Sequence, residues 1–344
     1  MNEKPLPDWD RLTFSFIETD VMYRAEGDLS RDPIWEEGAF SPIEETKLSP
    51  AASFLSFGVG IFEGLKAQRA RDGRILLFRI GENAARFRRS AERLLMAPFP
   101  ADRFVTAVSE LVRRNERWVP PFGRGSFYVR PTEHAVGQHL GLEPSIRFMV
   151  SMFGSPVGAY FAKTPTAGTN GVRLRVLEQG RVAYGGTGAA KAAGNYAGGI
   201  YVAAQWKKQG FDDVLYLDAR EARVLTETSG SNVFVKLKSG ALVTPPLDDQ
   251  ILPGVTRDSV IRVARELLGV PVEERPVPIE EAVENGEEIF CTGTAWTVTS
   301  VREIVWRDRA YAFPKNDLCR TLLDRVRGIQ TGEHENPFGW TTAV

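Results

Sequence analysis

The sequence is poor in the residues that build disulfide frameworks, metal centres and membrane spans. Its 344 residues include two cysteines, Cys291 and Cys319, which cannot form a disulfide framework and are compatible with a reducing cytoplasm. Of its three histidines, His134 and His139 are five residues apart, a spacing that fits no strong metal-binding pattern. No run approaches the roughly 20 apolar residues of a membrane helix, and the N-terminus carries no secretory signal. We therefore expect a cytoplasmic protein without a metal ion.

Net charge and chain length restrict the possible binding partners and the domain organisation of the protein. The 43 basic and 44 acidic residues leave a net charge of −1, so no global field favours nucleic acid or a membrane surface as a partner. A chain of 344 residues is long enough for two domains that enclose a cofactor between them. The stretch 158–171 is rich in glycine, proline and threonine and is expected to be the interdomain loop. We expect a smaller N-terminal domain over 1–157 and a larger C-terminal domain over 172–344.

Hydrophobic periodicity indicates a mixed α/β chain. The helix predicted over 81–95 turns Phe87, Ala91, Leu94 and Leu95 to one face. The other predicted helices cover 102–118, 198–208 and a segment that begins near Arg257 and stops before Gly269. The predicted strands are 75–78, 126–130, 146–153, 172–177, 214–217 and 233–237.

The most informative segment is GGTGAAKAAGNY, over 185–196, which sets Lys191 among glycine, alanine and threonine. Small neighbours leave room for a flat ligand, and a partly desolvated lysine has a lowered pKa and becomes a nucleophile. This chemistry suits a Schiff base with pyridoxal phosphate. The same letters also suit a flexible turn with a solvated lysine. A nucleotide-binding loop is a third interpretation, but the spacing fits neither a Walker loop nor a GxGxxG fingerprint.

A pyridoxal phosphate site also needs a carboxylate for the pyridine nitrogen and a cradle for the phosphate. Glu227, expected in a polar turn before a strand, can supply the carboxylate, although a solvated acid fits the same position. Gly254, Val255 and Thr256 precede a predicted helix, whose first N–H groups can bind a phosphate. Thr256 also suits an ordinary N-cap.

The remaining parts of such a site have candidates as well. Thr294 follows an apolar strand and can donate to the phosphate, and Arg86 can add a fixed positive charge. Tyr196 can donate to the phenolic oxygen of the cofactor. Tyr128 and Arg130 share one strand face, where they can meet a substrate carboxylate. Each also has a plain interpretation, namely a surface arginine, a half-buried tyrosine or a cross-strand salt bridge.

In this order, the segments resemble the fold-type IV pyridoxal phosphate enzymes, and among them the branched-chain amino-acid aminotransferases. Eight landmarks in register carry the resemblance over nearly the whole chain. They are SFGVGIFEGLKA, the helix around Arg86, SFYVRP, PVGAYF, GGTGAAKAAGNY, TETSGSN, ILPGVTR and TGTAWTV. The resemblance implies a smaller α+β N-terminal domain and a larger C-terminal domain with a β-barrel-like core, with pyridoxal 5'-phosphate as the cofactor.

The resemblance also implies a role for individual residues. Lys191 would be the Schiff-base lysine, Tyr196 the partner of the phenolic oxygen and Glu227 the partner of the pyridine nitrogen. The residues implied to hold the phosphate are Arg86, Val255, Thr256 and Thr294. The residues implied to bind the substrate are Phe62, Tyr128, Arg130, Tyr160, Thr294 and Ala295. Leu140 would reach into the site of a second subunit, which implies a homodimer or a higher homo-oligomer.

The implied activity is the transamination of leucine, isoleucine and valine with 2-oxoglutarate, giving branched-chain 2-oxo acids and L-glutamate in a ping-pong cycle. Other reactions on the same fold remain alternatives: D-amino-acid or (R)-amine transamination, or aminodeoxychorismate lysis. A catalytically silent binding protein is disfavoured because Lys191, Tyr196 and Glu227 are all present. Phe57 stands where many relatives have tyrosine, which removes a hydroxyl from the expected pocket. The paired cysteines of the mammalian enzymes are absent, so we expect no thiol redox switch.

Overall fold

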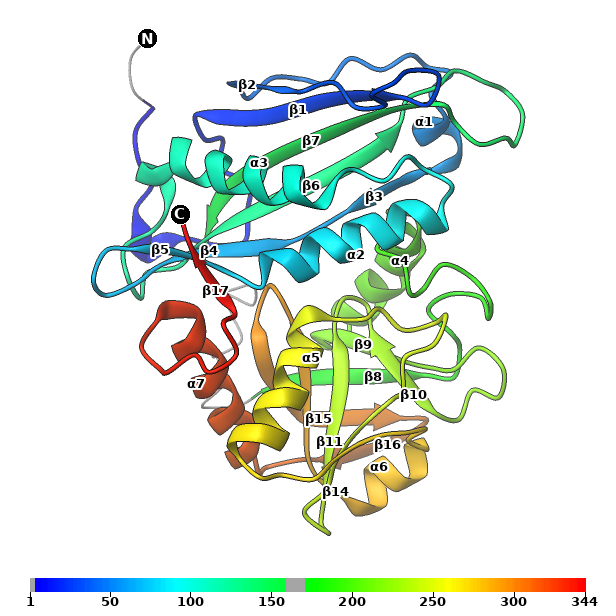
Figure 1. Cartoon of the computed structure of the whole chain (residues 1–344). Coiled ribbons are helices and arrows are strands. Elements are labelled where there is room, and N and C mark those ends of the chain that lie inside the picture. Colours follow the sequence, from blue (N-terminus) through cyan, green and yellow to red (C-terminus); the bar gives the residue numbers. More distant parts are fainter. Residues whose placement is uncertain (1–3, 159–170) are drawn as a thin grey trace. The chain divides into compact units, whose positions relative to one another are not determined.

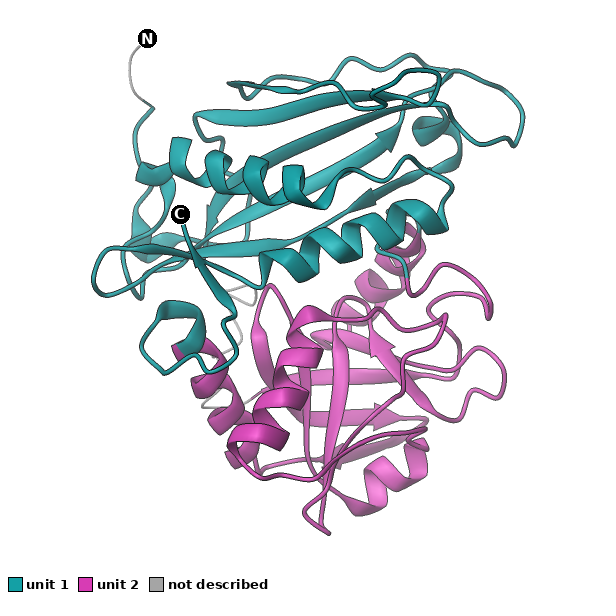
Figure 2. Cartoon of the chain, in the orientation of Figure 1, with its two compact units in different colours: residues 1–160, 190–194, 329–344 teal, residues 161–189, 195–328 magenta. Residues whose placement is uncertain are grey.

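A computed structural model describes residues 4–158 and 171–344 of the chain (Figure 1). The described residues form two compact units, one of 4–158, 190–194 and 329–344 and the other of 171–189 and 195–328 (Figure 2). The expected division into 1–157 and 172–344 assigned Lys191 to the C-terminal domain, whereas here it groups with N-terminal residues. Tyr160 lies outside the described residues, as does most of the expected loop 158–171.

The first unit contains an eight-stranded sheet in the order β17-β5-β4-β6-β7-β1-β2, with β3 paired to β6. All of the strand pairs described in it are antiparallel. The strands are β1 (Val21–Asp28), β2 (Ala39–Pro42), β3 (Gly60–Phe62), β4 (Leu65–Arg69), β5 (Ile75–Phe78), β6 (Ser126–Ala135), β7 (Arg147–Val157) and β17 (Thr341–Ala343). The helices are α1 (Ser53–Phe57), α2 (Ile80–Arg93) and α3 (Ala101–Arg114), followed by a 3-10 turn over Glu116–Trp118.

The two faces of strand β6 have different roles, one in the hydrophobic core and the other in the candidate site. Burial alternates along it, so that Phe127 and Val129 are fully buried while Tyr128 and Arg130 point to the opposite face. Phe127 and Val129 join a hydrophobic core with residues of α2 and α3, which lie on one face of the sheet (Figure 1). The other face of β6 is therefore the one that can present polar side chains to a ligand.

Helix α2 was predicted over 81–95 and is found over Ile80–Arg93. Phe87 and Ala91 are fully buried, as its periodicity predicted. Leu95, expected on the same face, is instead 66% exposed. The reason is local, because the helix ends at Arg93 and Leu95 adopts a left-handed φ of 54° that turns the chain away.

The second unit contains a closed ring of strands. Its nine-stranded sheet runs β10-β9-β8-β15-β14-β11-β12-β13, and β10 also pairs with β11, so six strands form a barrel-like ring. This is the core that the family resemblance implied. Strand β16 pairs antiparallel with the last residues of β15. The strands are β8 (Val172–Leu177), β9 (Asp213–Leu217), β10 (Leu225–Thr228), β11 (Asn232–Leu237), β12 (Leu242–Thr244), β13 (Val272–Glu274), β14 (Gly286–Gly293), β15 (Thr297–Trp306) and β16 (Arg309–Ala312).

The helices associated with this unit are α4 (Gly194–Lys207), α5 (Val255–Arg262), α6 (Ile279–Asn285) and α7 (Asp317–Thr331), with a π-helical turn over Val263–Leu267 after α5. Helix α4 was predicted over 198–208 but begins at Gly194, so it includes Asn195 and Tyr196. The predicted stop at Gly269 is confirmed by its left-handed φ of 64°. Within residues 4–158 and 171–344, no helix has the length and hydrophobicity needed to cross a membrane.

Candidate active site

The backbone around Lys191 is fixed by residues of β3 and α2. The Lys191 N–H donates to Oγ of Ser90 at 2.9 Å, and its carbonyl accepts from the Phe62 N–H at 3.1 Å. The N–H of Ala193 donates to the carbonyl of Gly60 at 2.9 Å. The segment therefore pairs with β3 like a short extra strand, which holds the lysine at a defined position in the first unit.

Four of the predicted site residues meet at the face of β6 that carries Tyr128 and Arg130. The Nζ of Lys191 lies 4.6 Å from the ring centroid of Phe62, and the guanidinium carbon of Arg130 lies 4.9 Å from the same centroid. Arg130 also lies 5.3 Å from the ring centroid of Tyr128 and donates to the Tyr128 hydroxyl at 3.3 Å. Both cations are within the range of a cation–π attraction. The structure thus brings Lys191, Phe62, Tyr128 and Arg130 together.

The absence of a side chain at Gly64 leaves the space that the Tyr128 hydroxyl occupies. A Cβ atom added to Gly64 would lie only 1.9 Å from that oxygen, far inside van der Waals contact. Any other residue at this position would therefore displace the tyrosine. Gly64 belongs to the landmark SFGVGIFEGLKA, but the sequence gives no sign of this contact.

Arg86 is held by an acid that the sequence reasoning missed. Its Nε lies 2.6 Å from Oε1 of Glu63 and its Nη2 donates to Oε2 at 2.9 Å. Asn83 donates to Oε2 as well, at 2.9 Å, and Glu63 has no exposed surface. Burial alone would raise the pKa of Glu63, but the charge and hydrogen bonds of Arg86, helped by the charge of Lys191, hold that pKa below its usual range.

The pair also limits what Arg86 can do. Two of its N–H groups are committed to Glu63, and the side chain is only 4% exposed. The predicted contact between Arg86 and a phosphate therefore stays a prediction that has to be compatible with this pair. Glu63 was visible in the sequence as an isolated acid in an apolar landmark, GIFEG.

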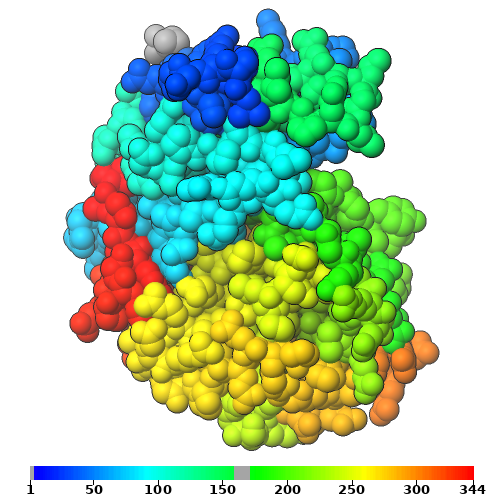
Figure 3. All heavy atoms as spheres, turned by 45° about the vertical axis from the view of Figure 1, so that its right-hand side comes forward, coloured from blue at the N-terminus to red at the C-terminus, as the bar shows by residue number. Residues whose placement is uncertain are grey.

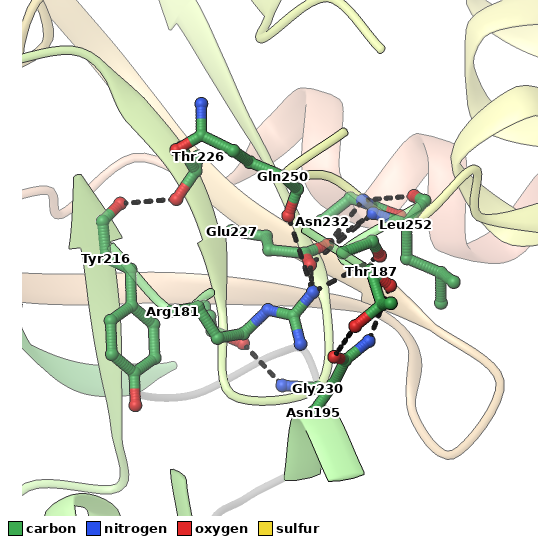
Figure 4. Close-up of polar contacts among 12 residues, drawn as sticks. Arg181, Thr187, Asn195, Tyr216, Thr226, Glu227, Gly230, Asn232, Gln250 and Leu252 are labelled. Carbon is green, nitrogen blue, oxygen red and sulfur yellow. Dashed lines mark hydrogen bonds and ion pairs between the residues drawn. The ribbon is translucent and has the colours of Figure 1, made fainter. Parts of the chain in front are cut away.

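Glu227 lies in the second unit, in strand β10 rather than in the polar turn that the sequence indicated (Figure 4). The turn comes just afterwards, because the Thr228 N–H donates to the Ser231 carbonyl at 2.8 Å. Glu227 is therefore 4% exposed instead of solvated. Its Oε1 lies 2.6 Å from Nη2 of Arg181, its Oε2 accepts from Nδ2 of Asn232 at 3.1 Å, and its carboxylate also accepts from a backbone N–H.

The backbone N–H that donates to Oε2 of Glu227, at 3.3 Å, is that of Leu252. Leu252 lies in the loop just before α5. Asn232 donates to the carbonyl of Leu252 at 2.9 Å, and a Cβ on Gly254 would lie 2.1 Å from Oδ1 of Asn232. Gly254 caps α5 without a side-chain hydrogen bond, so the interpretation of Thr256 as the N-cap is wrong. Thr256 sits in the first turn, and the first N–H groups of a helix attract anions.

The other predicted residues of the second unit lie in two places. Thr294 and Ala295, with Trp296, form the turn between β14 and β15, which is closed by the pairing of Gly293 with Thr297. Tyr196 is half-buried in the first turn of α4. The preceding residue, Asn195, exchanges two hydrogen bonds of 2.6 and 2.7 Å with Thr187, which ties the helix start to the glycine-rich segment (Figure 4).

Arg181 and Asn232 were not anticipated. Asn232 belongs to the TETSGSN landmark, where an amide next to a candidate carboxylate was a usable signal. Arg181 has no such signal, because a single arginine in a polar loop is normally solvated. Only the fold brings it to Glu227.

The donor set fits pyridoxal phosphate. An amine at Lys191 matches the aldehyde, a buried carboxylate at Glu227 matches the pyridine nitrogen, and the first turn of α5 with the Thr256 hydroxyl matches a phosphate. The six-stranded ring is also the barrel-like core typical of the fold-type IV pyridoxal phosphate enzymes.

Comparison with known proteins agrees. Residues 60–304 match the family described as Amino-transferase class IV. Branched-chain-amino-acid aminotransferase 5, chloroplastic, of Arabidopsis thaliana is 40% identical over 341 residues, which cover 98% of this chain and 80% of the relative. Methionine aminotransferase BCAT4 of the same plant is 38% identical, over 98% of this chain and 93% of the relative.

Solved structures give the same result. The branched-chain aminotransferase of Thermoproteus uzoniensis, solved with norvaline, has a TM-score of 0.79 at 27% identity and covers 94% of this chain and 99% of its own. The Thermobaculum terrenum enzyme in its PLP form has a TM-score of 0.77 at 26% identity, over 95% and 98%. The chain belongs to the class IV aminotransferases, within their branched-chain group, and is an enzyme whose cofactor is pyridoxal 5'-phosphate.

Proposed function

We propose that the chain transfers the amino group of L-leucine, L-isoleucine and L-valine to 2-oxoglutarate, giving branched-chain 2-oxo acids and L-glutamate. Its family and the names of its relatives support the reaction class. The observation that carries the proposal is the position of Lys191. Its backbone is fixed on both sides, and its amine lies over Phe62 on the face that presents Tyr128 and Arg130.

We assign the cofactor contacts as follows. When bound, pyridoxal phosphate supplies an aldehyde that links covalently to amines and a ring that withdraws electrons from the substrate α-carbon. Lys191 is the amine that anchors it, the Glu227 carboxylate is the partner of the ring nitrogen, and the Tyr196 hydroxyl is the partner of the phenolic oxygen. The phosphate is assigned to Arg86, Gly254, Val255, Thr256 and Thr294.

The proton movement is assigned to Lys191. Its neutral amine would take the proton from the α-carbon of the donor amino acid and pass it to the cofactor. In the second half-reaction it would move a proton from the cofactor to the α-carbon of the acceptor 2-oxo acid. Arg130, braced between Phe62 and Tyr128, meets the carboxylate of the substrate or of its co-substrate. The other residues that we assign to the substrate are Phe62, Tyr128, Tyr160, Thr294 and Ala295.

The test is covalent labelling combined with turnover. Borohydride reduction of the purified protein followed by peptide mapping should label Lys191, and L-leucine should change the visible absorption of the unreduced protein. Lys191→Ala should abolish turnover, whereas the surface variant Lys208→Ala should retain it. A label elsewhere, or near-normal turnover by Lys191→Ala, would contradict the proposal.

A substrate panel separates the proposal from its rivals on the same fold. We expect L-leucine, L-isoleucine and L-valine to react with 2-oxoglutarate, and D-alanine and (R)-1-phenylethylamine to remain unchanged. Including L-methionine tests side-chain preference, because one relative carries the name methionine aminotransferase. Reaction of D-alanine without L-leucine would overturn the substrate assignment.

We also propose a homodimer. The loop between β6 and β7, drawn in green in Figure 3, carries Leu140, Leu142 and Ile146, which are 93%, 89% and 54% exposed. Clustered apolar side chains at a surface are typical of an interface between chains. Sedimentation should show a dimer, and Leu140→Ser with Leu142→Ser should weaken it. A monomeric wild-type enzyme would exclude this assembly.

We also propose that the protein is located in a reducing compartment, namely the cytoplasm. Cys291 and Cys319 are both buried and free, so neither forms a disulfide. Cell fractionation followed by immunodetection would test the compartment. Detection in an organelle fraction alone would contradict the cytoplasmic assignment.

A further inference from the structure

Arg181 is buried beside Glu227 and contacts three segments of the second unit. Its side chain is 5% exposed, and its Nη2 lies 2.6 Å from Oε1 of Glu227 (Figure 4). The same nitrogen approaches the carbonyl oxygens of Gly188 and Gln250, each at 3.4 Å. Gly188 belongs to the segment that leads to Lys191, and Gln250 to the loop that leads to α5. One guanidinium thus contacts the β10 strand and both of these segments.

The surroundings of Glu227 favour its ionised form. An isolated buried carboxylate would be strongly destabilised and would take up a proton. Here Arg181 supplies an opposite charge, while Asn232 and the Leu252 N–H supply two further donors. Hydrogen bonds to the charged form of an acid and a nearby cation both stabilise the anion. The described contacts of Glu227 therefore make its carboxylate a weaker base than its burial alone would allow.

We propose that Arg181 is a positioning residue that controls where the proton between Glu227 and the cofactor's ring nitrogen resides. This inference rests on the proposed role of Glu227. A proton shared by a carboxylate and a pyridine nitrogen stays on the nitrogen when the carboxylate is the weaker base. Arg181 weakens that base and fixes its orientation, so the ring stays protonated and electron-withdrawing.

A purely structural role is the competing explanation. Arg181 could simply brace the backbones at Gly188 and Gln250, and its removal would then lower stability and cofactor content together. Activity alone cannot separate the two roles. The protonation state of the ring nitrogen can, because bracing does not by itself change which atom carries the proton.

The experiment uses holoenzyme reconstituted with pyridoxal phosphate that carries ¹⁵N in the ring. The ¹⁵N resonance at pH 7.5 is compared among the wild type, Arg181→Met, Arg181→Lys and Glu227→Gln. Arg173→Met is the control, since Arg173 pairs with Glu303 as a partly exposed ion pair on β8. Melting temperature and the dissociation constant of the cofactor are recorded for every variant.

We expect Arg181→Met to move the resonance toward the unprotonated position, in the same direction as Glu227→Gln. Arg181→Lys should lie between the wild type and Arg181→Met, because it keeps the charge but loses the planar fork. Arg173→Met should leave the resonance unchanged. The kcat of Arg181→Met should fall about tenfold, the factor that one pKa unit represents, with a smaller change in KM.

The outcomes distinguish the two claims. If Glu227→Gln moves the resonance and Arg181→Met does not, the inference about Arg181 fails while the role of Glu227 stands. If Glu227→Gln leaves the resonance unmoved, the proposed role of Glu227 fails and the inference falls with it. If Arg181→Met does not fold, Arg181→Lys decides, and an unshifted resonance in that variant overturns the inference.

Discussion

Glu63 and Arg86 form a buried ion pair in which Nε and Oε1 are 2.6 Å apart and the side chains are 0% and 4% exposed. Removing one partner leaves an uncompensated buried charge, so Glu63→Leu and Arg86→Met should each cost about 3–5 kcal/mol of unfolding free energy. The double variant should lose far less than the sum of the two. Urea denaturation of the four proteins measures this, and simple additivity would contradict the pairing.

The same pair should make stability sensitive to acid. The pKa of Glu63 lies below its usual range in the folded state, so the unfolded chain binds its proton first as pH falls. The stabilisation is present above the unfolded pKa of about 4.3 and is lost as pH falls through the folded value. Urea unfolding between pH 3 and pH 7 should therefore show a shallower acid loss in the double variant than in the wild type. Parallel curves would rule this out.

Gly64→Ala should disturb the substrate face without removing any functional group. The new Cβ would lie 1.9 Å from the Tyr128 hydroxyl, which has to move and take its contact with Arg130 with it. We expect KM for the amino acid to rise about tenfold, equivalent to about 1.4 kcal/mol. Gly81→Ala is the matched control, because a Cβ there meets nothing within 4 Å. Steady-state kinetics of both variants decide, and an unchanged KM in Gly64→Ala would refute the steric argument.

Gly254→Ala should weaken cofactor binding. Its Cβ would lie 2.1 Å from Oδ1 of Asn232, the residue that donates to Glu227 and to the Leu252 carbonyl. Displacing Asn232 disturbs the carboxylate and the start of α5 together, so we expect the cofactor's dissociation constant to rise at least about tenfold, or about 1.4 kcal/mol. Fluorescence titration of the apoprotein measures it. Gly230→Ala, where a Cβ meets nothing within 4 Å, should bind normally.

For Glu133 we predict a pH dependence of folding stability that is opposite to the one predicted for Glu63. It lies on β6 with 0% exposure, and neither of its carboxylate oxygens has a hydrogen-bond partner among the described residues. Burial raises its pKa well above the usual range, so the folded state binds the proton more tightly than the unfolded chain. Stability should therefore decrease as pH rises from the unfolded pKa toward the folded one.

Glu133→Gln, which carries no charge at any pH, tests this directly. At pH 8 it should gain about 1–3 kcal/mol over the wild type, because it has no ionisable group whose pKa burial raises, and each pKa unit is worth about 1.4 kcal/mol. At pH 4 the two proteins should differ much less. A gain that does not grow between pH 4 and pH 8, measured by urea denaturation, would show that Glu133 does not titrate as described.

Much of the fold followed from local pattern. The strands at 75–78 and 172–177 were predicted with the bounds that β5 and β8 have, because short apolar runs between turn residues specify a strand locally. Helix ends were less predictable. The true end of α2 at Arg93 and the start of α4 at Gly194 depend on backbone conformation and packing that a periodic pattern does not encode.

The part of the site that could be predicted from the sequence is the part whose chemistry depends on residues within a single segment. Lys191 was identified from its small neighbours, and Phe62, Tyr128 and Arg130 do gather beside it. Arg181 was not identifiable, because its ion pair with Glu227 joins residues that are far apart in the sequence and meet only in the folded barrel. The grouping of residues 190–194 with the first unit is a property of the same long-range kind.

The ring of strands in the second unit is completed where β10 meets β11, and the register pair there is Glu227 with Asn232. Glu227 is also the residue proposed to pair with the cofactor's ring nitrogen, and Asn232 donates a hydrogen bond to its carboxylate. The closure of the barrel and the proposed pairing with the ring nitrogen therefore depend on the same two residues, the first through their backbones and the second through their side chains. A substitution at Glu227 or Asn232 that alters this chemistry must therefore also preserve the pairing of β10 with β11 that closes the ring.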